Sequence, residues 1–454
     1  MPHDPVPGLL SRAAELLEKQ FAAMPAFESE ADPEAMARVL EDVARRMGDN
    51  YPYFHPLYAG QMLRPPHPVA RAAYALAMTL NPNNHARDGG RASSEMEIEA
   101  VREIAGIFGW TEFLGHLTSS GTIANLEALW VAGQLAPGKR IVGSEQAHYT
   151  HQRISAVLKL EYASIAADRR GRMSVDALEA ELRKGDVGTV IVTLGTTALG
   201  AVDPLDEVLA LREKYNFRVH VDAAYGGYFR LISNALDEPA RRAYAIIDQA
   251  DSIVIDPHKH GLQPYGCGCV LFRDPAVGRF YKHDSPYTYF TSKELHLGEI
   301  SLECSRAGAA AVALWATQRL LPLVPGGEFA RGLASSRAAA LELDRRLRQD
   351  KARHFQPLAA GAPELDIVVW QVNAKSPELA SELAQRIFSA CAERDLHLAL
   401  VQLPQAWFET ASCAADSAGL VTCLRSVLMK PEHEAWLDRI WERLTASCAE
   451  VMGE

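Results

Sequence analysis

The sequence predicts an α/β fold with a mainly parallel sheet in a large domain, followed by a smaller C-terminal α/β domain. From about residue 71 to 340, helical patterns alternate with short apolar strands, which is typical of a parallel sheet. The expected strands lie in the segments RIVGS, GTVIVTLGTT, FRVHVDAAY, SIVIDP and GCVLF. After residue 340, long helical patterns stand between strands such as ELDIVVWQV and GLVTCLRSVL. They predict the smaller domain.

The chain has 454 residues, which is long for a single core. We expect an N-terminal arm at 1–70, a large domain at 71–340 and a small domain at 341–454. The arm contains an amphipathic helix and a Pro-rich stretch, and it has too little core to fold alone. We therefore expect the arm to pack on the body or on a second subunit. The residues on the apolar face of its helix are Leu9, Leu10, Ala13, Leu16, Leu17 and Phe21.

Charge and composition exclude several classes of partner. A net charge of -11 argues against nucleic acid and anionic membranes, because both favour a basic surface. No signal-peptide pattern and no run long enough for a membrane span are present. Seven cysteines, an odd number, do not indicate a disulfide framework. Cys267 and Cys269 lack a second pair at zinc-site spacing, so we expect structural roles for them. A reducing cytoplasm fits best.

Lys259 lies between two histidines in the stretch DPHKHGLQPYGCG. A lone lysine is most often a solvated surface charge. The preceding ADSIVIDPHK, however, predicts a buried strand that ends beside this lysine. A lysine in such a position is typical of the amine that forms a Schiff base.

A pyridoxal phosphate (PLP) site needs a phosphate cradle, an acid facing the pyridine nitrogen and a group that covers the ring. The cradle candidate is HLTSSGTIANLEALWVA, where Ser119, Ser120, Gly121 and Thr122 lead directly into a helix. The backbone N–H groups and dipole at that helix N-terminus favour an anion. The same residues also make an ordinary helix cap.

The acid candidate is Asp222 in RVHVDAAYGG, at the end of a β-branched strand. Open α/β folds place their ligands at this edge of the sheet. A carboxylate facing the pyridine nitrogen would keep it protonated. Ala223 and Ala224 are small enough to let a flat ring lie close. A strand-end Asp is otherwise a cap.

The ring-covering candidate is His148 in SEQAHYTH. His148 and His151 could instead bind a metal, but no third ligand is apparent and the spacing fits no zinc-protease motif. We therefore predict no metal site. Thr197, in TLGTTALGAVDPL, could place its hydroxyl near the ring or could be a turn residue. Four such features in order, ending at Lys259, predict a PLP site.

The order Ser-Ser-Gly-Thr, His, Leu-Gly-Thr-Thr, Val-Asp-Ala-Ala-Tyr and Pro-His-Lys resembles the group II PLP-dependent amino-acid decarboxylases. This family includes aromatic L-amino-acid, tyrosine, glutamate and diaminobutyrate decarboxylases. The resemblance covers most of the chain, from FHPLYAGQM to VTCLR. It implies fold type I and a homodimer with active sites at the subunit interface, which suits an arm that cannot fold alone.

The resemblance also implies roles for individual residues. Lys259 would carry the cofactor, Asp222 would pair with the pyridine nitrogen and His148 would stack on the ring. Arg425 would bind the substrate α-carboxylate through its planar fork. Further cofactor contacts would come from Ser120, Gly121, Thr122, Thr197, Ala224 and His258, and substrate contacts from His55 and Gln61 in the His-Pro segment.

Two departures from the family pattern stand out. Ser120 replaces a glycine that many relatives have in the phosphate turn. Asp256 stands where some animal relatives have Asn, and since an acid would repel a phosphate, we expect Asp256 to face elsewhere. The family also has a loop tyrosine that protonates the substrate carbon, for which Tyr287 and Tyr289 are both available.

The expected reaction is decarboxylation of an L-amino acid to an amine, with an aromatic, tyrosine-type substrate favoured by DPHKHGLQPYGCG. The His-Pro segment carries Gln61 and Met62, and glutamate-type relatives also have a Gln there. Arg64, Arg87 and Arg91 could pair with a side-chain carboxylate. Decarboxylation of an acidic amino acid therefore remains an alternative. Other PLP reactions on this fold also remain alternatives, namely transamination, carbon–carbon cleavage of a sphingoid-type phosphate and aldehyde synthesis. A protein of this fold that has lost catalysis is a further alternative.

Overall fold

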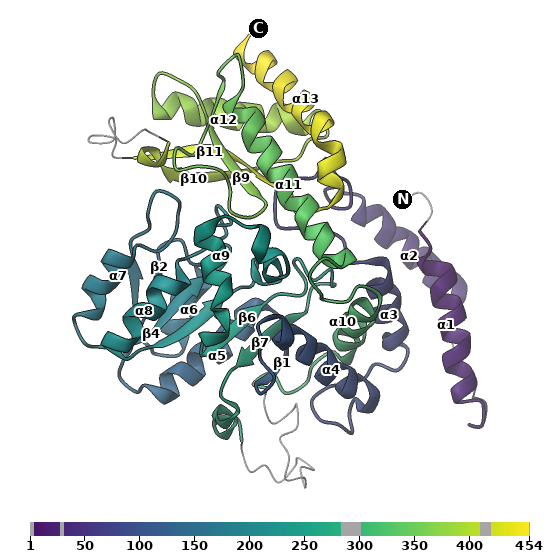
Figure 1. The fold of residues 1–454 in the computed structure, drawn as a ribbon. Helices are drawn as coiled ribbons and strands as arrows, with labels where there is room; N and C mark the ends of the chain where they lie inside the picture. Colours follow the sequence, from purple (N-terminus) through teal and green to yellow (C-terminus); the bar gives the residue numbers. More distant parts are fainter. Residues whose placement is uncertain (1–3, 28–30, 283–300, 409–418, 454) are drawn as a thin grey trace.

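The computed structural model describes residues 4–27, 31–282, 301–408 and 419–453, which form two lobes and an N-terminal arm (Figure 1). The large lobe contains a seven-stranded sheet in the order β1-β7-β6-β5-β4-β2-β3. Its strands are β1 (Leu114–Thr118), β2 (Arg140–Ser144), β3 (Tyr162–Ile165), β4 (Val187–Thr193), β5 (Arg218–Asp222), β6 (Ser252–Ile255) and β7 (Gly268–Phe272).

This sheet is mainly parallel, as predicted. The five strands from β6 to β3 run parallel, and β7 is antiparallel to both of its neighbours, β6 and β1. β4 and β6 are buried along their whole length, which explains their continuous β-branched sequences. The sequence did not predict β3, which lies at one edge of the sheet and is only partly buried. An edge strand needs fewer apolar residues, so its pattern is weaker.

Helices cover the sheet of the large lobe (Figure 1). They are α3 (Pro68–Met78), α4 (Arg91–Ile107), α5 (Gly121–Leu135), α6 (Thr150–Val157), α7 (Val175–Leu182), α8 (Leu205–Tyr215), α9 (Glu238–Ala245) and α10 (Gly308–Leu320). Short 3-10 helices lie at η1 (Gly227–Ala235), η2 (Ile247–Gln249) and η3 (Pro275–Phe280). α5 follows β1 directly, so its N-terminus opens at the edge of the sheet where β4 to β6 end.

The small lobe is an antiparallel sheet in the order β10-β11-β9-β8, packed against helices. Trp370 at its centre is fully buried. The strands are β8 (Phe355–Pro357), β9 (Ile367–Val372), β10 (Ala399–Pro404) and β11 (Leu420–Val427). The helices are α11 (Glu328–Arg348), α12 (Pro377–Ala392) and α13 (Glu432–Met452), with a 3-10 turn at η5 (Gln405–Trp407). A smaller C-terminal α/β lobe was predicted, and it is present.

Buried polar contacts join the two lobes. Asp366, just before β9, accepts a hydrogen bond from the Tyr225 hydroxyl at 2.6 Å, and its other oxygen lies 3.2 Å from Nε2 of His260. Glu364 accepts a bond from the Val202 N–H at 2.6 Å. α11 contacts both η1 and β9 and passes through residue 340. The division at residues 70 and 340 stays a prediction.

The arm consists of α1 (Val6–Gln20) and α2 (Pro33–Met47), neither of which has a buried residue. α1 packs on α3, where Asp4 forms a salt bridge with Arg71 at 2.8 Å. α2 exposes the apolar face formed by Met36, Val39, Leu40, Val43 and Met47. None of the helices in the described ranges has the length and apolar character of a membrane span.

Candidate active site

A cavity of about 200 Å³ lies at the carboxyl ends of β4, β5 and β6, beside the N-terminus of α5. This is the edge at which open α/β sheets place their ligands. The residues that line it are Met62, Ser120, Gly121, Thr122, Asn125, His148, Thr150, Thr193, Gly195, Thr197, Asp222, Ala224, Tyr225, Asp256, His258 and Lys259. The candidate residues for the lysine, the cradle, the acid and the ring cover therefore lie around one cavity.

The N-terminus of α5 forms one wall. Ser120 caps the helix, because its hydroxyl oxygen accepts a hydrogen bond from the Ile123 N–H at 3.3 Å. A Cβ atom at position 121 would lie only 2.5 Å from a carboxylate oxygen of Asp256, so a larger residue than Gly121 would push that carboxylate aside. The N-terminus of α5 borders the cavity and suits an anion, and the Asp256 carboxylate lies close to it at Gly121.

Asp256 corrects one expectation from the sequence. It was expected to face away from the phosphate cradle, but it lines the cavity and its Oδ2 lies 3.1 Å from Nζ of Lys259. The reason is a tight turn in which the Lys259 N–H bonds to the Asp256 carbonyl at 2.9 Å. His258 Nε2 lies 3.5 Å from the same oxygen. The acid thus neutralises the lysine and faces the positive end of the α5 dipole.

Asp222 is buried at the end of β5, and both of its oxygens have partners. Oδ1 accepts the Ala224 N–H at 3.1 Å, and Oδ2 lies 2.8 Å from Nε2 of His151. Burial by itself would raise the pKa of Asp222, but the His151 hydrogen bond and the nearby charge of Lys259 hold that pKa well below its usual range. Asp222 is therefore a carboxylate at neutral pH.

His148 precedes α6 and lines the cavity on the side of β2. Its Nδ1 lies 2.7 Å from the Thr150 hydroxyl, which fixes the plane of the ring. Burial lowers the pKa of His148, so the ring is neutral at physiological pH. In the described part of the chain, no group of three or more His, Cys, Asp or Glu residues is arranged to hold a metal ion.

Neither Arg425, on β11 of the small lobe, nor Gln61 is among the residues that line the cavity, but Arg425 contacts Thr197, which is. Its guanidinium donates to the Thr197 carbonyl at 2.6 Å and the Ala198 carbonyl at 3.0 Å, on the loop that follows β4. Nη1 makes longer bonds, at 3.3 Å to Oε1 of Gln61 and 3.4 Å to the Gly60 carbonyl. The contacts bring Arg425, Gln61 and Thr197 together beside the cavity.

Some predicted residues lie elsewhere. His55 is not among the residues that line the cavity, and its ring packs at 4.9 Å from the ring of Trp436. Arg64 bonds to the Met429 carbonyl at 2.9 Å and Arg87 pairs with Glu95. Tyr287 and Tyr289 lie outside the described residues.

Sequence reasoning missed two features of the site. His151 was weighed only as a metal ligand, although its place one helical turn after His148 could have suggested a shared site. His220 was not considered. It is fully buried and lies 2.8 Å from both Ser252 Oγ and Asn125 Oδ1.

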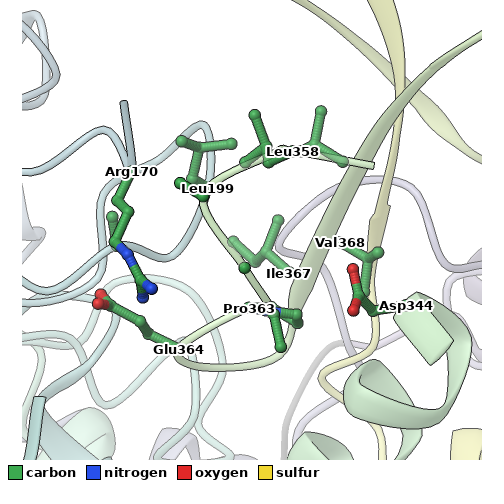
Figure 2. Close-up of a pocket in the computed structure, with 13 residues that line it drawn as sticks. Arg170, Leu199, Asp344, Leu358, Pro363, Glu364, Ile367 and Val368 are labelled. Atoms are coloured by element: carbon green, nitrogen blue, oxygen red, sulfur yellow. The ribbon is translucent and has the colours of Figure 1, made fainter. Parts of the chain in front are cut away.

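A second hollow lies between the lobes (Figure 2). On one side of it the Glu364 and Arg170 side chains lie near each other, and Leu199 and Ile367 also line it. Its volume of about 40 Å³ has room for a water molecule or two, and it cannot hold an amino acid. None of the proposed catalytic residues lines it. This hollow belongs to the joint between the lobes.

The chain is similar to one protein family and to several known proteins. Residues 23–324 match the family described as "Pyridoxal-dependent decarboxylase conserved domain". An L-tyrosine decarboxylase of Enterococcus faecium is 28% identical over 439 residues, covering 74% of this chain and 72% of the relative. A probable L-tyrosine/L-aspartate decarboxylase of Methanothermobacter thermautotrophicus is 29% identical over 332 residues, covering 72% and 85%. The structure of Oryza sativa TDC with PLP and tryptamine superimposes with a TM-score of 0.76 at 17% identity, covering 100% of this chain and 99% of that one.

Proposed function

Since this chain belongs to the pyridoxal-dependent decarboxylase family, it is a PLP-dependent amino-acid decarboxylase of fold type I, and we propose that it acts on an aromatic, tyrosine-type L-amino acid. The products are the corresponding amine and CO2. The observation that carries the choice is the position of the nearby arginines. An acidic side chain would need its own cation, but Arg64 and Arg87 are bound elsewhere and Arg91 is exposed at the start of α4. None of the three lines the cavity. Met62 and Tyr225, which line the cavity, suit an aromatic ring.

The residues present fit PLP by their chemistry. The α5 N-terminus and the Ser120 and Thr122 side chains suit the phosphate, and the charge of the Asp256 carboxylate, which lies beside Gly121, is offset by Lys259 at 3.1 Å. Asp222 suits the pyridine nitrogen, His148 a ring face and Lys259 the aldehyde carbon. His258, Thr197 and Ala224 line the same cavity. When bound, PLP supplies the sink for the electrons that CO2 leaves on the substrate Cα.

The chain's own residues then position the substrate and control protons. Arg425 binds the α-carboxylate, and Gln61 helps to hold the Arg425 guanidinium. Asp222 keeps the pyridine nitrogen protonated. Asp256 keeps the Lys259 amine close to the cradle. A tyrosine, Tyr287 or Tyr289, donates the proton that replaces CO2 at Cα.

We also infer a homodimer with active sites at the subunit interface and with the arm crossing to the partner. The support is the α2 face, where the five apolar residues from Met36 to Met47 are between 48% and 63% exposed. Such a face is stable only when it is covered. His55, on the segment after α2, would then approach the partner's site. A cytoplasmic location also stays a prediction.

The test is an assay of CO2 release with each of the twenty amino acids, with PLP supplied and Lys259→Ala as the blank. We expect L-tyrosine or a close aromatic relative to give the highest kcat/KM and the amine as product. Faster release from aspartate or glutamate would favour the acidic alternative, for which the name of the Methanothermobacter relative gives some support. An aldehyde as the main product would favour aldehyde synthesis.

A further inference from the structure

His151 makes a contact that the shape of the sheet does not require. It lies in the first turn of α6, which follows β2, whereas Asp222 ends β5. β4 separates these two strands in the sheet. The imidazole therefore reaches over the end of β4 to place Nε2 at 2.8 Å from Asp222 Oδ2.

Packing alone does not account for a histidine at this position. The side chain is fully buried, and its Nδ1 has no hydrogen-bond partner among the described residues. An apolar side chain would fill such a space without leaving a polar atom unsatisfied. The free-energy cost of burying this polar ring is offset only at Nε2, through the hydrogen bond to Asp222.

The bond to His151 fixes the direction of the Asp222 carboxylate. Because the Ala224 N–H holds Oδ1 and His151 holds Oδ2, the plane of the group is set by two donors from different elements. The Asp222 oxygens accept through the remaining lone pairs, which can point into the cavity.

The other titratable groups near Asp222 are bound to other partners, so His151 is the one among them that orients the carboxylate. His220 packs edge-on at 6.4 Å between ring centroids, but burial lowers its pKa to about 3, and Ser252 and Asn125 occupy its nitrogens. On the cavity side, His148 bonds to Thr150 and Lys259 pairs with Asp256. Among these groups, only His151 bonds directly to Asp222.

We propose that His151 is a positioning residue that keeps the Asp222 carboxylate ionised and aimed at the pyridine nitrogen of PLP, and thereby sets the protonation of that nitrogen. The inference rests on the proposed role of Asp222. It gives His151 no contact with substrate and no part in proton transfer to Cα.

The experiment compares two cofactors on apoprotein, PLP and its 1-deaza analogue, in which a C–H group replaces the pyridine nitrogen. Dissociation constants are measured for the wild type, His151→Leu, His151→Gln and Asp222→Asn. We expect His151→Leu to weaken PLP binding by about tenfold or more, as for the loss of one hydrogen bond to a charged group. Binding of the deaza analogue should stay near the wild-type value. Gln can donate from the Nε2 position and should restore most of the PLP affinity.

A second readout is the NMR shift of PLP labelled with ¹⁵N in the ring. It should move toward the unprotonated value in His151→Leu and return in His151→Gln. Equal weakening of both cofactors in His151→Leu would show a structural role and overturn the inference, as would unchanged PLP binding and an unchanged ¹⁵N shift. Asp222→Asn distinguishes a failure of the proposed role of Asp222 from a failure of the role proposed for His151. If Asp222→Asn keeps the wild-type preference for PLP over the analogue, the proposed role of Asp222 fails. If only His151→Leu keeps that preference, this inference alone fails.

Discussion

Replacing Arg425 tests the proposal that it binds the substrate carboxylate. The side chain is 4% exposed, and its four hydrogen bonds all go to neutral acceptors. A guanidinium has five N–H groups, so one N–H on Nη2 stays available, and the two bonds of Nη1 are long enough to be exchanged. A carboxylate that arrives beside Nη1 and Nη2 would therefore meet a buried positive charge with free donors.

The size of the effect follows from this geometry. Arg425→Met removes one partner of a desolvated charge pair, which costs about 2–5 kcal/mol, or roughly 30-fold to 4,000-fold in affinity for the amino acid. Arg425→Lys keeps the charge but loses the planar fork, so we expect a smaller loss of roughly 10-fold to 150-fold, the equivalent of one charged hydrogen bond. Both variants also leave carbonyls of Thr197 or Ala198 without a donor, so a lower melting temperature is expected.

The assay separates binding of the carboxylate from general damage to the site. For each variant, kcat/KM is measured for the amino acid, and the inhibition constant is measured for its amine, which lacks the carboxylate. We expect Arg425→Met to lose the amino acid while amine inhibition stays close to the wild-type value. If the amine is weakened as much as the amino acid, or if neither changes, Arg425 does not hold the carboxylate.

Further predictions concern the lysine, the dimer, acid stability and the product. Lys259→Ala should abolish CO2 release while the protein stays folded and still binds PLP non-covalently, because the α5 N-terminus can still hold the phosphate; near-native turnover would remove the central assignment. Leu40→Asp on the apolar face of α2 should shift the dimer toward monomer in light scattering, whereas Arg38→Ala on the same helix should not; a stable wild-type monomer would contradict the dimer. His433 is fully buried, and burial lowers its pKa to about 3, compared with about 6.5 in the unfolded chain. Between these two pH values the unfolded chain binds more protons than the folded one, so the stability of the fold decreases as the pH drops below about 6.5. When the pH is lowered from 7.5 to 5, the free energy of unfolding measured by urea titration should therefore decrease by about 2 kcal/mol less in His433→Gln than in the wild type. Equal decreases in the two proteins would show that His433 does not cause the loss of stability in acid. Either Tyr287→Phe or Tyr289→Phe should divert product from amine toward aldehyde, ammonia and peroxide, and amine alone from both variants would exclude both tyrosines as the proton donor.

The sequence by itself determined the class of fold and predicted the cofactor candidates that line the cavity, among them Asp222 and Lys259, but not the whole lining. Strand patterns that end at Asp222 and just before Lys259 are local signals, because a β-branched run and the polar residue that follows it are adjacent in the chain. The Ser120 cap and Gly121 are local in the same sense. Once the sheet is mainly parallel, such strand ends must meet at one edge, so the order of motifs was enough to predict a common site.

Only the tertiary structure decided which of these residues contact one another. Asp222 and His151 are separated by 71 residues and by β4, and Arg425 and Thr197 lie on different lobes, 228 residues apart. No local pattern encodes such pairs, since they depend on the strand order and on how the lobes pack. The direction of Asp256 was mispredicted for a related reason. Repulsion from a phosphate was considered, whereas the turn at 256–259 and the charges of Lys259 and the α5 dipole direct the carboxylate into the cavity.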